Sequence, residues 1–447
     1  MSSKRTLVWF LLGMGAQFQI VASLSMTELF VLFAAPLLIF REYSKMKRNG
    51  VLPLFVLSLF VVIGCICSCV VNRVSSYAAL RGGATTCLIS CAIIVSHWVL
   101  RRDFGGFKWF LIGSALSFFL SAFVFQHSVE VTMLADGRVG SSAVVDAIMS
   151  GPIFWTTRLS SIIGAVLKGW YLQLPSAVCG VVPLILALFA LLTSESGRSI
   201  ALGLIAMSMI VFIGGKSPER IKRLVCRRLW LLIGVAIMCL FIANQTYRYA
   251  ALNGLMGEKS RIKYEKQSHG SDSIAKLLLA GRMDSFCGLL ACIDRPIFGY
   301  GPWAIDDYGY ISTFLSRYAD EEDYRDHVEL MRFYSTRGTL PVRLIPCHSF
   351  ITQFWLWYGV SGLIFWIYVL FVLFRFLRQD CFAVPQMFMW LAAGVPAFMW
   401  NVFFSPFSDR FGTMLFLTAC LMVRAVRKGT MQLPERMKIE MLRYERP

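Results

Sequence analysis

The chain has 447 residues, of which 57% are hydrophobic and only 16% are charged. Soluble domains carry about a quarter charged residues, so this composition excludes an ordinary soluble domain and indicates a chain solvated by lipid. A formal net charge of +18 would suit nucleic-acid binding, but the basic residues cluster in short connections between apolar runs, which excludes that class.

Many apolar runs reach the roughly 17–25 residues that cross about 30 Å of hydrocarbon as a helix. In chain order we expect spans at 7–24, 51–71, 78–100, 107–126, 175–193, 199–215, 229–246, 349–374, 383–402 and 409–424. A shorter span at 27–40 forms a tight hairpin with the first. The first apolar run resembles a signal peptide but lacks a small-residue cleavage site, so we expect it to stay uncleaved.

A twelfth span is needed to place all basic clusters on one side of the membrane. With the N-terminus inside, eleven spans would put KSPERIKRLVCRR (216–228) outside, against the tendency of basic loops to remain cytoplasmic. A span at 153–172 removes the conflict, since Lys168 can snorkel at its end. The sequence therefore predicts an all-α polytopic membrane protein with about twelve transmembrane helices and both termini in the cytoplasm.

The one long hydrophilic segment, 247–348, is predicted to face outward as a large, partly helical loop. It holds 13 Lys/Arg and 13 Asp/Glu, so it is neutral and offers no footprint for nucleic acid. Apolar positions recur at helical spacing from Ile274 to Cys292, and the sequence DRPIFGYG then ends that helix in a tight turn. A second amphipathic helix is expected at 311–334, whose acidic ADEED lacks the pattern of a calcium loop.

Thirteen cysteines lie scattered, mostly in apolar spans and without zinc spacing, so we interpret them as small buried hydrophobes. Cys287, Cys292 and Cys347 are the three in the long loop, where one disulfide is possible. The predicted organisation is an N-terminal group of spans (1–174), a core with the outer loop (175–374), C-terminal spans (375–424) and a basic cytoplasmic tail (425–447).

Three polar residues stand where apolar segments meet the outer face. Arg198 joins two spans, Arg282 lies in the first outer helix, and His348 directly precedes the run at 349–374. Charges at membrane depth are candidates for function, although a snorkelling arginine, a solvated arginine and a helix-end histidine are the plain structural alternatives. Arg343 and Arg295 are further candidate arginines of the loop.

Together these segments resemble the O-antigen ligase and polymerase family of membrane glycosyltransferases. SESGRS resembles the family's step between two spans, GRMD…RPIFGYG its arginine and glycine turn, and HSFITQFWLWYGVSG its His-Ser start of a span. Gly197 precedes Arg198 where the family has serine. The resemblance covers about 175–375 and implies a C-type glycosyltransferase-like fold in a bacterial inner membrane, with its active site facing the periplasm.

The resemblance also implies the chemistry. An acceptor hydroxyl attacks the anomeric carbon of a glycan while undecaprenyl diphosphate leaves, without a metal or other cofactor. Arg198 and Arg282 would bind the diphosphate, because guanidinium groups suit phosphate, with Arg343 and Arg295 as further substrate-binding candidates. His348 would be the general base on the acceptor, and Arg198 and Arg282 would act with it in catalysis.

Other functions remain open at this point. A polymerase would share these residues with a ligase and differ in using a lipid-linked glycan, not lipid A core, as acceptor, and a protein-glycosylating transferase is a third variant. A polysaccharide transporter would also be polytopic, but it should show repeated halves and short outer loops. The single large loop favours an enzyme, and a pure scaffold is the least favoured class.

Overall fold

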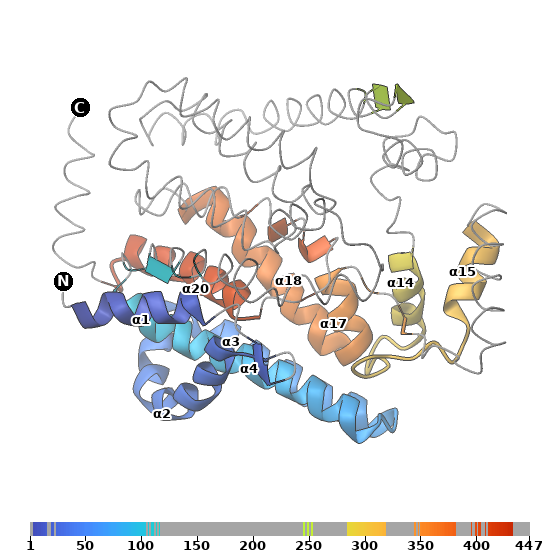
Figure 1. Ribbon diagram of the computed structural model, residues 1–447, viewed down its shortest axis with the longest axis horizontal. Coiled ribbons are helices and arrows are strands. Elements are labelled where there is room, and N and C mark those ends of the chain that lie inside the picture. The colour runs from blue at the N-terminus through green and yellow to red at the C-terminus, as the bar shows by residue number, and fades with distance from the viewer. Residues whose placement is uncertain are drawn as a thin grey trace.

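The computed structural model describes residues 3–15, 19–21, 24–103, 284–318, 349–380 and 410–431, with shorter stretches and single positions within 106–116, 245–253, 344–347 and 395–407. This part of the protein is mostly helical, as Figure 1 shows. Two of its helices, Leu52–Val71 and Ser76–Arg102, are long and apolar enough to cross a membrane. The predicted helical class is therefore confirmed, whereas the total of about twelve spans stays a prediction.

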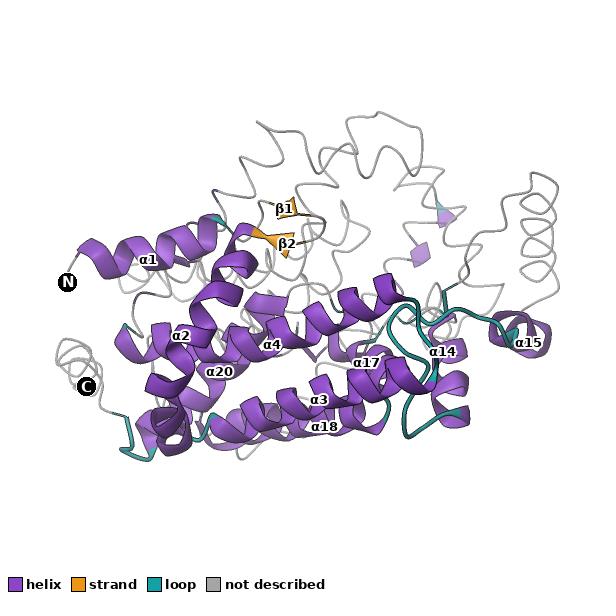
Figure 2. Cartoon of the chain, turned by 90° about the horizontal axis from the view of Figure 1, so that it is seen from below, coloured by secondary structure: helices purple, strands orange, loops and turns teal. Residues whose placement is uncertain are grey.

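The described elements are α1 (Ser3–Met14), β1 (Gln19–Val21), β2 (Leu24–Ser25), α2 (Met26–Asn49), α3 (Leu52–Val71), α4 (Ser76–Arg102), α14 (Asp284–Asp294), α15 (Tyr310–Tyr318), α17 (Phe350–Tyr358), α18 (Val360–Arg375), the π-helix η3 (Phe376–Asp380) and α20 (Arg410–Arg427). Helix α4 packs against α2, α3 and α20, while α18 packs against α3, α17 and α20. Figure 2 shows α3 beside α4 and α18, with α14 and α15 at one end of these helices.

The prediction of one span at 7–24 is wrong, because α1 ends at Met14 and the chain then forms the antiparallel pair of β1 and β2. The close approach of α2 stops the helix. The Thr27 hydroxyl donates to Leu12 O at 2.6 Å, and a Cβ on Gly15 would lie 2.8 Å from that same hydroxyl oxygen. Glycine is also a poor helix former, so Gly15 favours the end of α1.

Helix α2 starts with a capping box, in which Ser25 accepts from the Glu28 N–H and Glu28 accepts from the Ser25 N–H. The predicted short span at 27–40 is thus the first part of a longer helix, which ends at Gly50 with φ 73°. Predicted spans 51–71, 78–100 and 409–424 correspond to α3, α4 and α20. The remaining predicted spans lie wholly or largely outside the described residues.

Helix α3 faces the outside of the bundle, since only 33% of its most apolar stretch is buried, against 72% for α4. Its exposed side chains are themselves large and apolar, among them Ile63, Ile66 and Val70. On its inner side, a Cβ on Gly64 would lie 1.9 Å from Ser361 Oγ, so α3 and α18 approach closely through small residues. An apolar outer surface with small residues at helix contacts is typical of helices in lipid.

The prediction of one span at 349–374 is also wrong, because the chain reverses at Gly359 between α17 and α18. Twelve residues of one straight helix would separate Phe354 from Trp366 by about 18 Å. Their ring centroids lie 5.4 Å apart, and the ring of Phe350 lies 5.1 Å from that of Trp366. Gly359 has φ 64° and ψ −148°, a conformation that only glycine adopts readily.

The basic helix ends gather at one end of the bundle. The last turns of α2, α4 and α20 contain the pairs Lys47 and Arg48, Arg101 and Arg102, and Arg424 and Arg427. Asn49 at the end of α2 contacts His97 of α4 at 3.0 Å and Met422 of α20 at 3.8 Å, so the three helices end side by side. The turn between α3 and α4 lies at the opposite end of α4. We call these the basic end and the turn end of the bundle.

Gly359→Ala should destabilise the protein by about 3 kcal/mol or more, because alanine is strained at this φ and its Cβ would overlap a neighbour. A Cβ at Gly359 would lie 1.9 Å from Ile297 O. Thermal unfolding of the purified protein in detergent measures the effect. Gly83→Ala is the matched control, since a Cβ at Gly83 meets nothing within 4 Å, and it should change stability by less than about 1 kcal/mol. Equal stability of the two variants would contradict the reversal.

Candidate functional site

Of the residues predicted to act on the substrate, Arg295 belongs to the part of the chain that the structure describes. The others lie outside it and stay predictions: Arg198, Arg282, Arg343 and His348. The two neighbours of His348 are described, with Cys347 half-buried and Ser349 buried. The site is therefore built from the turn that contains Arg295 and from the start of α17.

Helix α17 begins inside the protein. Ser349 caps it by accepting from the Thr352 N–H at 3.2 Å, while the Ser349 hydroxyl donates to Val402 O at 2.9 Å. The Gln353 side chain accepts from the Phe407 N–H at 2.8 Å. The helix that follows His348 thus starts among buried residues of the C-terminal segment, and not at the exposed end of a straight span.

The predicted turn after the outer helix is confirmed. Helix α14 ends directly before Arg295, and the Gly299 N–H closes the turn by donating to Arg295 O at 3.0 Å. Gly299 and Gly301 have φ values of 66° and 90°, which L side chains rarely adopt. A Cβ would lie 2.4 Å from Leu356 O at the first glycine and 2.3 Å from the Val74 side chain at the second. Both glycines therefore allow close packing as well as the turn itself.

This turn docks on the reversal between α17 and α18. Three hydrogen bonds join them: the Val360 N–H to Ile297 O at 3.0 Å, the Tyr300 N–H to Leu356 O at 2.6 Å and the Trp355 Nε1–H to Pro296 O at 3.1 Å. Backbone groups of two tight turns thereby satisfy each other. The segments RPIFGYG and HSFITQFWLWYGVSG, which are far apart in the sequence, are consequently in direct contact.

Arg295 ties this turn to the end of α3. Its Nη1 donates to Asn72 Oδ1 at 2.7 Å and its Nη2 donates to the Tyr308 hydroxyl. Its guanidinium carbon also lies 4.7 Å from the ring centroid of Tyr300 and 5.1 Å from that of Tyr308. Asn72 donates in turn to Gly299 O at 3.1 Å. Two of the five guanidinium N–H donors are used in these contacts, so Arg295 has a positioning role, and its substrate contact stays a prediction.

A hydrogen-bonded group of tyrosines surrounds Asp294. The hydroxyl of Tyr310 donates to Asp294 Oδ2, and the hydroxyls of Tyr300 and Tyr310 contact each other. Burial raises the pKa of Tyr300, and burial together with the hydrogen bond to Asp294 raises the pKa of Tyr310. Both phenols therefore stay protonated as hydrogen-bond donors near neutral pH. Asp306 caps α15 by accepting from the Tyr310 N–H at 2.7 Å.

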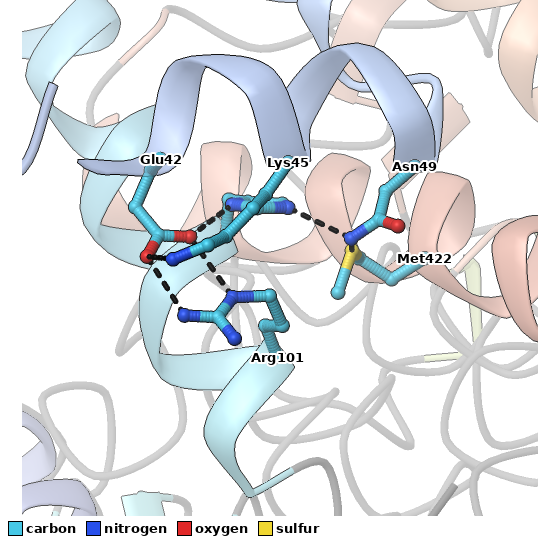
Figure 3. Close-up of polar contacts among 6 residues, drawn as sticks. Glu42, Lys45, Asn49, Arg101 and Met422 are labelled. Carbon is cyan, nitrogen blue, oxygen red and sulfur yellow. Dashed lines mark hydrogen bonds and ion pairs between the residues drawn. The ribbon is translucent and has the colours of Figure 1, made fainter. Parts of the chain in front are cut away.

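A second polar centre lies at the basic end of the bundle (Figure 3). The Glu42 side chain, 1% exposed, accepts from Arg101 Nε at 3.0 Å and from Arg101 Nη2 at 2.8 Å. His97 Nδ1 lies 3.0 Å from the same carboxylate, and Lys45 Nζ lies at 3.4 Å. His97 Nε2 accepts from the Asn49 amide, so the ring proton of His97 is on Nδ1, the nitrogen nearest to Glu42. One carboxylate thus joins α2 to α4.

Glu42 lies beyond the predicted span at 27–40. Burial raises the pKa of Glu42, but the nearby His97 and Arg101 outweigh that effect and lower the pKa to about 2. The carboxylate therefore stays ionised at every physiological pH. This arrangement fits a structural ion-pair centre that holds the ends of α2 and α4 together, since all its partners are protein side chains.

The sequence reasoning missed this second centre and the contacts of Arg295. His97 stands alone in an otherwise apolar stretch, IVSHWVL, and an ionisable side chain inside a predicted span was a signal for it. Glu42 lies within a basic cluster of the sequence, where a single acidic residue indicates only a solvated ion pair at the surface. Nothing in the sequence indicated that Asn72 of the turn between α3 and α4 would meet Arg295.

No family model, curated protein or solved structure matches the chain. The resemblance to the O-antigen ligase family therefore depends on the motifs themselves.

We predict that Arg295 and Asn72 are energetically coupled. Arg295→Ala and Asn72→Ala should each lower thermal stability, and the double variant should be less destabilised than the sum by about 1–2 kcal/mol, because both single changes break the same hydrogen bond. Unfolding of the four proteins in detergent gives this coupling. Additive effects would show that the guanidinium does not depend on Asn72.

Glu42→Gln should destabilise the protein by about 3 kcal/mol, because it leaves the half-buried Arg101 guanidinium without its carboxylate and the buried His97 ring without its ionised neighbour. Lys45→Gln is the control: its longer contact with Glu42 is partly exposed, and its loss should cost less than about 0.5 kcal/mol.

The pH dependence of stability gives a second measure of Glu42. A pKa of about 2, below the ordinary 4.5, means that the contribution of Glu42 is complete above pH 4.5 and is lost as the pH falls toward 2. Glu42→Gln should remove that part of the acid-induced loss. An unchanged acid transition in the variant would contradict the ion-pair centre.

Proposed function

We propose that this chain is a metal-independent membrane glycosyltransferase of the O-antigen ligase type. It transfers a glycan from undecaprenyl diphosphate to a hydroxyl of lipid A core, at the periplasmic face of a bacterial inner membrane. A polymerase of the same family, which uses a lipid-linked glycan as acceptor, is the alternative.

The observation that supports this proposal most is the contact between two of the three motif segments. The turn at 295–301 and the α17–α18 reversal share backbone hydrogen bonds, although about sixty residues separate them in the chain. Two glycine turns without a common role would not be expected to form hydrogen bonds with each other. The contact brings the end of the loop helix to the helix that directly follows His348.

The orientation in the membrane follows from charge. Basic residues remain preferentially in the cytoplasm, so the basic end of the bundle is assigned to that side. The turn end, with Arg295 and the tyrosines around Asp294, then faces the periplasm. Lipid-linked diphosphates would be met at this face, close to the ends of α3 and α4.

In the proposed mechanism, the acceptor hydroxyl loses its proton to His348 while its oxygen forms a bond to the anomeric carbon. The bond from that carbon to the diphosphate oxygen breaks, and undecaprenyl diphosphate leaves with the electron pair. Arg198 and Arg282 stabilise the negative charge that develops on the diphosphate, since fixed cations outside bulk water act strongly on such charge. Arg295, held by Asn72 and Tyr308, keeps the turn in place.

His348→Ala should lower turnover by about 10²–10⁴, the usual contribution of a general base. Transfer is measured with purified protein, an undecaprenyl-diphosphate-linked glycan and lipid A core. His327→Ala, a second histidine of the same predicted loop, is the control and should retain near-native transfer.

Near-native transfer by the His348 variant would remove this residue from the mechanism. Transfer to a second lipid-linked glycan, with none to lipid A core, would establish the polymerase alternative. No transfer to either acceptor by the unaltered protein would contradict the proposed function.

A further inference from the structure

Arg81 is a charged residue inside an apolar helix. The basic residues of α4 are Arg81 near its start and the pair Arg101 and Arg102 at its basic end. Arg81 lies five residues after Ser76, about 7–8 Å along the helix from the turn end. This is the depth of lipid headgroups for a helix that crosses the membrane. An ionisable side chain at that depth is costly and is usually functional.

The guanidinium group of Arg81 is stacked on tryptophan. Its central carbon lies 4.3 Å from the ring centroid of Trp303, whose own ring lies 4.6 Å from that of Trp357 on α17. A stacked guanidinium keeps its N–H donors in its own plane, where they can bind an anion. The ion pairs among the described residues involve other basic side chains, and the carboxylates of Asp294 and Asp306 are occupied by Tyr310.

The backbone around this stack is strained. Among the described residues, the non-glycine residues with positive φ are Arg73, at 49°, and Trp303, at 54°. They lie on the two segments that meet here, the turn between α3 and α4 and the turn after Gly301. A Cβ on Gly82, next to Arg81, would lie 2.1 Å from Pro302, so the second turn is pressed onto α4. Such strain is retained where the surrounding structure holds it, often at ligand sites.

We propose that Arg81, held on Trp303, binds the phosphate of a lipid in the leaflet at the turn end of the bundle, with an isoprenoid diphosphate as the preferred lipid. Among the described residues, none accepts from the Arg81 side chain, and such a guanidinium at headgroup depth offers the fork that phosphate binds best. The neighbouring Trp303 and Trp357 supply apolar surface for the lipid beside that phosphate. Only the preference for an isoprenoid diphosphate rests on the proposed function; the phosphate site does not.

Native mass spectrometry of the full-length protein tests this site. Undecaprenyl diphosphate and phosphatidylglycerol are titrated separately onto the unaltered protein and onto Arg81→Gln. We expect Arg81→Gln to bind undecaprenyl diphosphate at least tenfold more weakly. Arg102→Gln is the matched control, because Arg102 stacks on Trp98 at 4.7 Å at the basic end of the same helix, and it should bind as the unaltered protein does.

Equal binding by Arg81→Gln and Arg102→Gln would overturn the proposal. If Arg81→Gln loses tenfold in affinity for undecaprenyl diphosphate alone, both the phosphate site and the preference for the diphosphate are supported. An equal loss of affinity for phosphatidylglycerol supports the phosphate site and overturns the preference for the diphosphate. If Arg81→Gln does not fold, Arg81→Lys, which keeps the charge but loses the fork, should still weaken binding, and unchanged binding would overturn the site. Failure of transfer by the unaltered protein, with binding intact, would count against the proposed function alone.

Discussion

The turn at 295–301 and the reversal at Gly359 depend on each other. Each is a tight bend whose backbone groups would be costly to bury alone, and each supplies the other's hydrogen-bond partners. Glycine is required on both sides, because a side chain at Gly299 or Gly359 would overlap the opposite backbone. This contact fixes where α14 ends and where α17 begins. It also places Arg295 against α3 and Trp303 against α4.

Sequence patterns predicted α3, α4 and α20 well. In lipid, a long apolar run can satisfy its own backbone hydrogen bonds only as a helix. The same patterns failed at 7–24 and 349–374, where the chain reverses within a continuous apolar run. Hydropathy cannot distinguish a straight span from two helices folded back on each other, since both are apolar throughout. The pairs of glycines, Gly13 and Gly15 or Gly359 and Gly362, were the available signals. The predicted domain boundaries and the positions of Arg198, Arg282, Arg343 and His348 stay predictions.

The two polar centres lie at opposite ends of α4 and differ in kind. At the basic end, Glu42 is surrounded by Lys45, Arg101 and the ring of His97, so its partners are all side chains of the protein and the centre is structural. At the turn end, Arg81 and Arg295 are held by aromatic rings and an amide, and no described carboxylate neutralises them. Composition alone did not separate these cases, because a basic residue near a helix end suggests snorkelling in both. The hydrogen-bond and ion-pair partners of each basic side chain show whether it is available to bind a ligand.

Hydrogen exchange tests the docking of the turn on the reversal most directly. The amides of Tyr300 and Val360 are the donors that join the two segments, at 2.6 Å and 3.0 Å. Mass spectrometry of the full-length protein in detergent, with peptides that cover 297–301 and 356–362, follows their exchange. We expect both amides to exchange as slowly as those in the core of α4, because both are hydrogen-bonded across the contact. Exchange of either amide as fast as that of an exposed loop would contradict it.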